Sequence, residues 1–215
     1  MISHKHAEPD PAHAARLERL ILASPILAPI VRQWEAIALP DCWLVAGALA
    51  QTVWNNAFGF DPDYGMKDID LVYFDGSDLS EAAEADHEAR IRHMFSGRGI
   101  TIDVKNEARV HLWYSRKFGS EISPYTSTRH AIAIFPTTAT AIGIQPAAPE
   151  LLISAPFGLD DLFESVVRPN KMKITPAIYA AKVTRWRALW PRLRIVDWLD
   201  DFIGSQEPDA SAPCA

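Results

Sequence analysis

The chain has 215 residues, of which 48% are hydrophobic and 22% are charged, a composition typical of a globular domain with a sizeable core. Its net charge of −6 gives it no general attraction to DNA or to an anionic membrane, so any phosphate must be bound locally, by a metal or by a few cations. Two cysteines without zinc spacing, a start that lacks the apolar core of a signal peptide, and the absence of a membrane-spanning apolar run favour a cytoplasmic protein.

Apolar spacing and turn residues predict alternating helices and strands through the first two-thirds of the chain. Residues 11–38 have apolar residues at helical spacing but contain Pro25 and Pro29. Because an interior proline costs a helix about 3 kcal/mol, two short helices are expected there instead of one. The elements expected next are a strand at 42–47, a helix at 48–59, a strand at 68–74, a helix at 77–95 and a strand at 99–105.

The rest of the chain is expected to be mostly helical. The expected elements are helices at 106–119, 126–135, 158–167 and 175–190 and a strand at 139–145. This order predicts an α/β or α+β fold, built on a small sheet with flanking helices and a helical C-terminal region. We expect a single domain over residues 1–205, followed by a disordered tail at 206–215.

Three aspartates are expected to lie close together if two of these strands are neighbours. In "KDIDLV", Asp68 and Asp70 share one face, because side chains alternate along a strand. In "TIDVKN", Asp103 points away from the apolar Ile102 and Val104. Taken alone, an Asp-x-Asp pair is equally consistent with solvated charges on a surface strand.

A divalent cation would relieve the repulsion between three such carboxylates, each of which is costly to bury unpaired. Oxygen ligands alone select Mg²⁺ or Mn²⁺, and Mg²⁺ commonly takes a few carboxylates together with substrate phosphates. Upstream, Gly47 lies at a predicted strand-to-helix turn, where the lack of a side chain lets backbone amides reach a phosphate. This combination indicates phosphoryl or nucleotidyl transfer.

Residues near the third aspartate could contact a nucleotide. Lys105 lies on the same strand face as Asp103, and it could bind a phosphate or neutralise the acidic cluster. Asn106 and Arg109 follow it, and the guanidinium of Arg109 could offer a bidentate contact to a triphosphate.

The glycine turn, the Asp-x-Asp strand and the later lone aspartate together resemble the nucleotidyltransferase superfamily, which has the DNA polymerase β-like fold. The segments "WLVAGALAQTVWN", "IDVKNEARVHLWY" and "APFGLDDLFESVVRPN" further resemble a family of bacterial nucleotidyltransferase-like proteins, over about residues 15–190. The resemblance implies a mixed sheet with flanking helices and a catalytic core at about 40–130. It also implies Asp68, Asp70 and Asp103 as metal ligands, and these are the predicted catalytic residues. Together with the positions argued above, the predicted nucleotide-binding residues are Gly47, Ala48, Lys105, Asn106 and Arg109.

The superfamily usually has Gly-Gly or Gly-Ser at the turn, whereas this chain has Gly47-Ala48. The alanine removes one possible hydroxyl donor but keeps the backbone amides. The resemblance implies a Mg²⁺- or Mn²⁺-dependent enzyme that moves an NMP from an NTP to an acceptor hydroxyl on a small molecule, a protein or RNA. The acidic charge and the absence of a long apolar run predict neither a DNA nor a membrane partner. The alternative is a catalytically idle nucleotide-binding or regulatory module on the same fold.

The strand at 68–74 also fits Asp-x-Asp-x-Val, the opening of haloacid-dehalogenase-type phosphatases. That chemistry requires the nucleophilic aspartate at the carboxyl end of a buried strand. Here a loop, "DYGMK", leads into the aspartates, which begin the strand, so the phosphatase is disfavoured. A metal-dependent glycosyltransferase would also use Asp-x-Asp but would need neither Gly47 nor Asp103.

Overall fold

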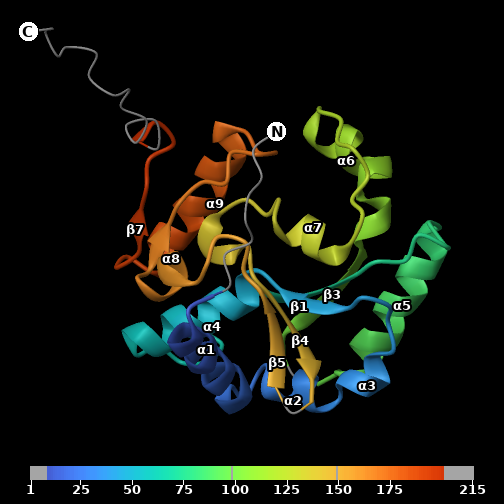
Figure 1. Ribbon diagram of the computed structural model, residues 1–215, viewed down its shortest axis with the longest axis horizontal. Coiled ribbons are helices and arrows are strands. Elements are labelled where there is room, and N and C mark those ends of the chain that lie inside the picture. The colour runs from blue at the N-terminus through green and yellow to red at the C-terminus, as the bar shows by residue number, and fades with distance from the viewer. Residues whose placement is uncertain (1–8, 98, 149, 201–215) are drawn as a thin grey trace, which may run out of the picture.

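The computed structural model describes residues 9–97, 99–148 and 150–200. Its centre is a five-stranded mixed sheet with helices on both faces, which confirms the fold class expected from the sequence (Figure 1). Within this sheet β2 and β3 pair in parallel, and the other neighbours are antiparallel. The strands have the order β3-β2-β1-β4-β5, with bounds β1 Trp43–Val45, β2 Asp68–Tyr73, β3 Thr101–Asn106, β4 Gly143–Ala147 and β5 Glu150–Ser154.

The helices begin and end at residues with clear local roles. Asp10 caps α1 by accepting hydrogen bonds from the amides of Ala12 and His13, and Ser80 caps α5. Gly59 ends α4 with a φ of 75°, which a residue without Cβ adopts readily. The helices are α1 Pro11–Ala23, α2 Ala28–Arg32, α3 Trp34–Ile37, α4 Gly47–Phe58, α5 Glu81–Met94, α6 Val110–Phe118, α7 Thr128–Ile132, α8 Asp160–Phe163 and α9 Pro176–Leu189.

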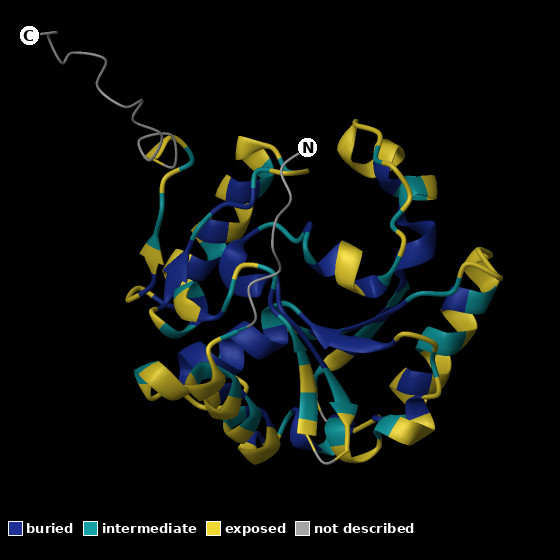
Figure 2. Cartoon of the chain, in the orientation of Figure 1, coloured by how far each residue is buried: buried dark blue, intermediate teal, exposed yellow. Residues whose placement is uncertain are grey.

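The two faces of the sheet have different surroundings. Ile69 and Leu71 of β2 pack in the main hydrophobic core with residues of α1, α4, α5 and α9, whereas Val72 packs on the other face against α7. Because side chains alternate along a strand, Asp68 and Asp70 also face the α7 side. Figure 1 shows α6, α7 and α9 on that side of the sheet, and Figure 2 shows β1 and α4 buried between the layers.

The N-terminal helices are more divided than the sequence predicts. Residues 11–38 form three helices instead of two. Pro29 lies in the first turn of α2, where a proline is tolerated, but Gln33 leaves the helical backbone region and separates α2 from α3. Ala38 then ends α3 with a left-handed φ of 48°.

The C-terminal region departs further from the expected elements. The strand expected at 139–145 begins only at Gly143, because residues Thr138–Thr140 form a 3₁₀ turn. The helix expected at 158–167 stops at Phe163, and Ser165 has a φ of 59°, which a helix does not accommodate. Two short parallel strands that the sequence did not predict follow, β6 Val166–Val167 and β7 Arg194–Ile195.

Within the described ranges, the helices are too short or too polar to cross a bilayer. The expected tail at 206–215 lies outside the described residues, as does the start of the expected domain at 1–8. The single domain over 1–205 therefore stays a prediction.

Candidate active site

The parallel pairing of β2 and β3 places the three predicted aspartates on one face of the sheet. Asp70 lies opposite Asp103 in the register of the two strands, and Asp68 lies opposite Thr101. Paired residues of neighbouring strands point to the same side of a sheet, so the strands bring the three carboxylates to the α7 side. The neighbouring strands that the sequence argument required are therefore present.

Asp68 and Asp70 line a pocket of about 350 Å³ between the sheet and the helices α6, α7 and α9. Asp103 lies outside this lining, and its Oδ1 accepts a hydrogen bond from the Arg92 Nη2 on α5 at 2.6 Å. The same guanidinium also pairs with Glu88. In the described part of the chain, no group of three or more histidines, cysteines or acidic residues is arranged to hold a metal ion. Two of the three predicted carboxylates therefore share the pocket.

The charge on Asp70 is costly in this pocket. Burial raises the pKa of Asp70 to about 6, and the carboxylates of Asp68 and Asp103 act in the same direction. The ammonium groups of Lys182 and Lys105 oppose this rise but do not cancel it. A cation bound beside Asp70 would remove most of this cost.

Glu107 is a further acidic residue of the pocket that the sequence argument did not single out. It follows β3 in a 3₁₀ turn, lines the pocket and is 7% exposed. Burial raises its pKa to about 8, with smaller contributions from the carboxylates of Asp70 and Glu84. No sequence signal marked Glu107, because its burial depends on the packing of its 3₁₀ turn against β2, α6 and α7.

The turn between β1 and α4 contributes backbone amides to the pocket wall. Gly47 is the first residue of α4 and lines the pocket, and no side chain of the described residues caps this helix. A Cβ added to Gly47 would lie 3.2 Å from the Gln51 Nε2, so a larger residue would crowd the turn. The first amides of α4 are therefore available to an anion.

The unusual backbone of this turn is at Ala46, not at the Ala48 that the sequence argument identified. Ala46 has φ 58° and ψ −123°, a conformation that glycine adopts far more readily than alanine. Ala48 is fully buried in α4 and lies outside the pocket lining. The structure therefore does not bring the Ala48 side chain to the site. The alanine that occupies a backbone conformation typical of glycine is Ala46, the residue before Gly47.

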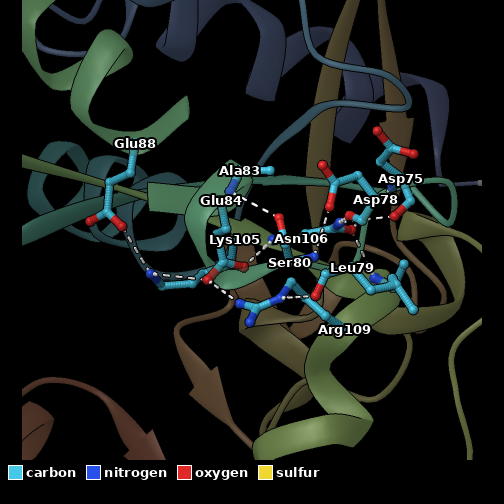
Figure 3. Close-up of polar contacts among 11 residues, drawn as sticks. Asp75, Asp78, Leu79, Ser80, Ala83, Glu84, Glu88, Lys105, Asn106 and Arg109 are labelled. Carbon is cyan, nitrogen blue, oxygen red and sulfur yellow. Dashed lines mark hydrogen bonds and ion pairs between the residues drawn. The ribbon is translucent and has the colours of Figure 1, made fainter. Parts of the chain in front are cut away.

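Lys105 lines the pocket and also neutralises acidic groups of α5. Its Nζ lies 3.0 Å from the Glu88 Oε2 and 3.9 Å from the Glu84 Oε1 (Figure 3). The sequence argument expected Lys105 to neutralise the aspartate cluster, whereas its ion pairs in the structure are with the glutamates of α5. Access to the pocket leaves Lys105 able to contact a ligand as well.

Asn106, predicted to contact a nucleotide, instead binds the loop between β2 and α5 (Figure 3). Its Nδ2 donates to the carbonyl oxygens of Asp75 and Asp78 at 2.9 and 3.3 Å. Its Oδ1 accepts from the amides of Asp75 and Ala108 at 3.0 and 3.1 Å. The side chain is almost fully buried and lies outside the pocket lining.

Arg109 has a similar structural position. Its Nη1 pairs with the Glu84 Oε1 at 2.8 Å, and its Nε donates to the Leu79 carbonyl at 3.1 Å (Figure 3). Both partners of the ion pair are buried. The guanidinium is therefore used within the fold, and the structure does not bring it to the pocket where a triphosphate would bind.

The sequence argument did not identify three residues that line the pocket, because their positions there depend on contacts between distant parts of the chain. Gln51 of α4 lines the pocket, and its Oε1 is buried without a hydrogen-bond partner among the described residues. Lys182 and Arg185 of α9 line the same pocket. Their spacing of three residues placed them on one helix face, but nothing in the sequence showed that this face meets β2.

The far wall of the pocket is apolar. It is built mainly from α6 and from the segments around α7 and the start of α9, and its aromatic members are Trp113, Tyr114, Phe118, Tyr125, Phe135 and Trp186. The Tyr114 hydroxyl is already bonded to the Lys173 carbonyl at 3.0 Å. The pocket therefore combines a charged end at the sheet with an aromatic wall, an arrangement suited to a molecule with a charged end and a flat body.

A family model described as "Nucleotidyltransferase" matches residues 32–195, about three-quarters of the chain. The chain belongs to this nucleotidyltransferase family. The matched range contains β1 to β7 and the whole candidate site. A search of curated proteins gives no match.

Two solved structures have a similar fold. One, described as a CCA-adding enzyme head domain determined by NMR, is 23% identical, has a TM-score of 0.70, and the match covers 85% of this chain and 95% of that one. The other, a Thermotoga maritima CCA-adding enzyme complexed with tRNA, is 16% identical with a TM-score of 0.50, and the match covers 88% of this chain but 44% of that enzyme. At these identities the likeness shows a shared nucleotidyltransferase head-domain fold.

Proposed function

We propose that this family member is a metal-dependent enzyme that transfers an NMP from an NTP to an acceptor hydroxyl. The observation that carries the proposal is that Asp68, Asp70 and the uncapped start of α4 at Gly47 line one pocket. Two carboxylates to hold a cation and free amides to hold a phosphate are the parts that this chemistry requires. The acceptor is a small molecule, a protein or RNA, and the expected setting is the bacterial cytoplasm.

The residues of the pocket fit one divalent cation. Mg²⁺ is usually held by one or two carboxylates together with substrate phosphates, and Asp68 and Asp70 supply two carboxylates on one face. The raised pKa of Asp70 shows that its charge lacks sufficient compensation in the protein alone. When bound, the ion would supply neutralisation of phosphate charge and a lower pKa for the acceptor hydroxyl. Asp103 is proposed as a third ligand, which it could become once its ion pair with Arg92 opens.

The residues of the chain would bind and orient the nucleotide. The amides that begin α4 at Gly47 hold phosphate oxygens, and Lys105, also in the pocket lining, adds a positive charge. In the reaction, the acceptor oxygen bonds to the α-phosphorus while the bond from that phosphorus to the pyrophosphate oxygen breaks, and the proton of the acceptor hydroxyl is released to solvent.

The test is the thermal stability of the protein with Mg²⁺ or Mn²⁺ and each of the four NTPs. A ligand that binds only the folded state raises stability by about 2.7 kcal/mol at a hundredfold excess over its dissociation constant. We expect a metal-dependent rise with at least one NTP, which Asp70→Asn abolishes. Asp86→Asn, an exposed position on α5, is the matched control and should keep the rise. No rise with any NTP, or a rise that persists in Asp70→Asn, would contradict the proposal.

The ion pair between Arg92 and Asp103 favours a second candidate, a nucleotide-binding module without transferase activity. Because Asp103 is paired with Arg92, two of the three carboxylates, and not all three, are available to bind a metal ion. The two candidates differ in product: the enzyme releases labelled pyrophosphate from a γ-labelled NTP when its acceptor is present. Metal-dependent NTP binding without pyrophosphate release, with small-molecule, protein and RNA fractions each supplied as acceptors, would support the binding module.

A further inference from the structure

Helix α9 brings two cations to the pocket that contains the aspartates. Lys182 and Arg185 lie three residues apart, so they share one face of the helix, and both line the pocket with Asp68 and Asp70. The helix is fixed in place by Trp190 just after its end, whose indole Nε1 donates to the Asn55 Oδ1 of α4 at 2.7 Å. The position of the two cations is therefore set by packing.

The Arg185 guanidinium makes one hydrogen bond within the protein, and one of its buried N–H groups has no partner among the described residues. Its Nη2 donates to the Gly65 carbonyl at 2.8 Å, in the loop that leads into β2. Its Nε is buried and has no hydrogen-bond partner among the described residues. A buried donor without a partner costs free energy, and a ligand oxygen would offset that cost.

Lys182 is also not paired with a carboxylate. No ion pair of its ammonium is present within the described ranges, and its Nζ lies 5.3 Å from the ring centre of Trp186. The residue as a whole is exposed, but its ammonium group lies near the acidic residues of the pocket. Desolvation lowers the pKa of Lys182, while the carboxylates of Asp70 and Asp68 act in the opposite direction.

We propose that Lys182 and Arg185 form an anion site on α9 that binds the polyphosphate end of the nucleotide. The guanidinium suits two oxygens of one phosphate group, and the ammonium suits a neighbouring phosphate as a point charge. This inference rests on the proposed function and deepens it, because it assigns the contacts of the leaving pyrophosphate to a helix outside the sheet. It also predicts that the site binds an inorganic polyphosphate when no metal is present.

Metal-free binding separates the role of α9 from that of the aspartates. Without a divalent cation, the carboxylates of Asp68 and Asp70 repel a polyphosphate, whereas Lys182 and Arg185 attract it. Removing a cation of α9 should therefore weaken metal-free binding. Removing the charge of Asp70 should leave it unchanged or strengthen it, the opposite of its effect on metal-dependent NTP binding.

The experiment is calorimetric titration of the full chain with inorganic tripolyphosphate in EDTA at one fixed, low salt concentration. We expect Lys182→Gln and Arg185→Gln each to weaken binding about tenfold or more, since each removes a charge-assisted contact. Arg187→Gln, exposed on the same helix and outside the pocket lining, is the matched control and should bind as the wild type does. Lys182→Gln keeps the test sound if Arg185→Gln loses its anchor at Gly65 and unfolds.

Two results would overturn the inference: no binding of tripolyphosphate to the wild type, or equal binding by the wild type and Lys182→Gln. If NTPs still give a metal-dependent rise in stability lost in Asp70→Asn, the proposed function survives that failure. The reverse result, tripolyphosphate binding that depends on Lys182 without any NTP effect, would support an anion site and contradict the nucleotidyltransferase.

Discussion

At the scale of single residues, Asp70 and Ala46 are both held in unfavourable states at the same pocket. Asp70 is half-buried near Asp68, and its pKa is raised to about 6 by burial. Ala46 has a φ of 58°, which costs a non-glycine residue about 1–3 kcal/mol. Strained backbone and poorly compensated charge tend to occur where a ligand binds. A ligand that neutralises Asp70 would offset the cost of burying its charge. The same ligand could contact the backbone amides that the strained turn at Ala46 positions.

The backbone strain at Ala46 predicts that Ala46→Gly stabilises the protein. Glycine removes the clash of Cβ at positive φ, although it gains more conformational freedom in the unfolded chain. We expect a net gain of about 1 kcal/mol, or about 2–4 °C in melting temperature for a chain of this size. Ala48→Gly, two residues further into α4, is the matched control and should lose about 1 kcal/mol, because it places glycine inside a helix. Equal destabilisation by both substitutions, measured by urea denaturation, would show that Ala46 is not strained.

At the scale of elements, the end of β3 is held by a polar network that joins it to α5 and to the loop before α5. Glu84 of α5 accepts from the Asn106 amide at 2.8 Å and pairs with Arg109, and the Asn106 side chain binds the loop. This network fixes where β3 ends and thus where Lys105 and Glu107 enter the pocket. Asn106 and Arg109, which the sequence suggested as nucleotide contacts, therefore support the site without lining the pocket.

The buried pair of Arg109 and Glu84 gives an element-scale prediction. Arg109→Met should destabilise the protein by about 3 kcal/mol, because it removes the buried partner of Glu84 and leaves that carboxylate only the Asn106 amide and the Lys105 ammonium at 3.9 Å. Adding Glu84→Gln should recover much of that loss, since the remaining partner is then uncharged. Urea denaturation of both single variants and of the double variant completes the cycle, and Arg116→Gln, exposed on α6, is the control. Additive losses in the double variant would be inconsistent with a direct pair.

The sequence predicted those elements whose signals are local. The alternation in "DIDLVY" gave β2, and Gly59 and Gly119 gave the ends of α4 and α6, where both adopt positive φ. The elements that were missed depend on tertiary contacts. β5 is an edge strand that pairs only with β4 in the described sheet, and the two-residue strands β6 and β7 exist through their mutual pairing. Short segments of this kind carry too little pattern to be recognised alone.

At the scale of the whole molecule, the site is closed by segments distant in sequence. The face shared by Asp68 and Asp70 was predictable from the period of a strand, and their common pocket with Gly47 followed from the order of the elements. The pairing of Asp103 with Arg92 was not predictable, because it depends on the packing of α5 beside β3. The same holds for the cations of α9, which reach β2 from more than a hundred residues further along the chain.

This closure predicts a pH dependence of folding stability that arises at the pocket. Glu107 has an ordinary pKa of 4.5 and a folded-state pKa raised to about 8 by burial, so the folded state binds its proton more tightly than the unfolded state. Its contribution is fully present below pH 4.5 and is lost as the pH rises toward 8. Asp70 acts in the same direction between pH 3.8 and about 6. A single group of this kind changes stability by at most about 1.4 kcal/mol per pH unit within its window.

The measurement is the free energy of unfolding in urea at pH 5.5 and pH 8.5, in EDTA, for the wild type and for Glu107→Gln. Glutamine has the shape of the protonated glutamate and does not titrate, so the variant should gain stability relative to the wild type as the pH rises. Glu121→Gln, at an exposed position, is the control and should follow the wild type at both pH values. The difference between wild type and variant removes the contribution of other titrating groups. A difference that stays constant between the two pH values would mean that Glu107 is ionised throughout, which would contradict the desolvation of its carboxyl group in the folded state.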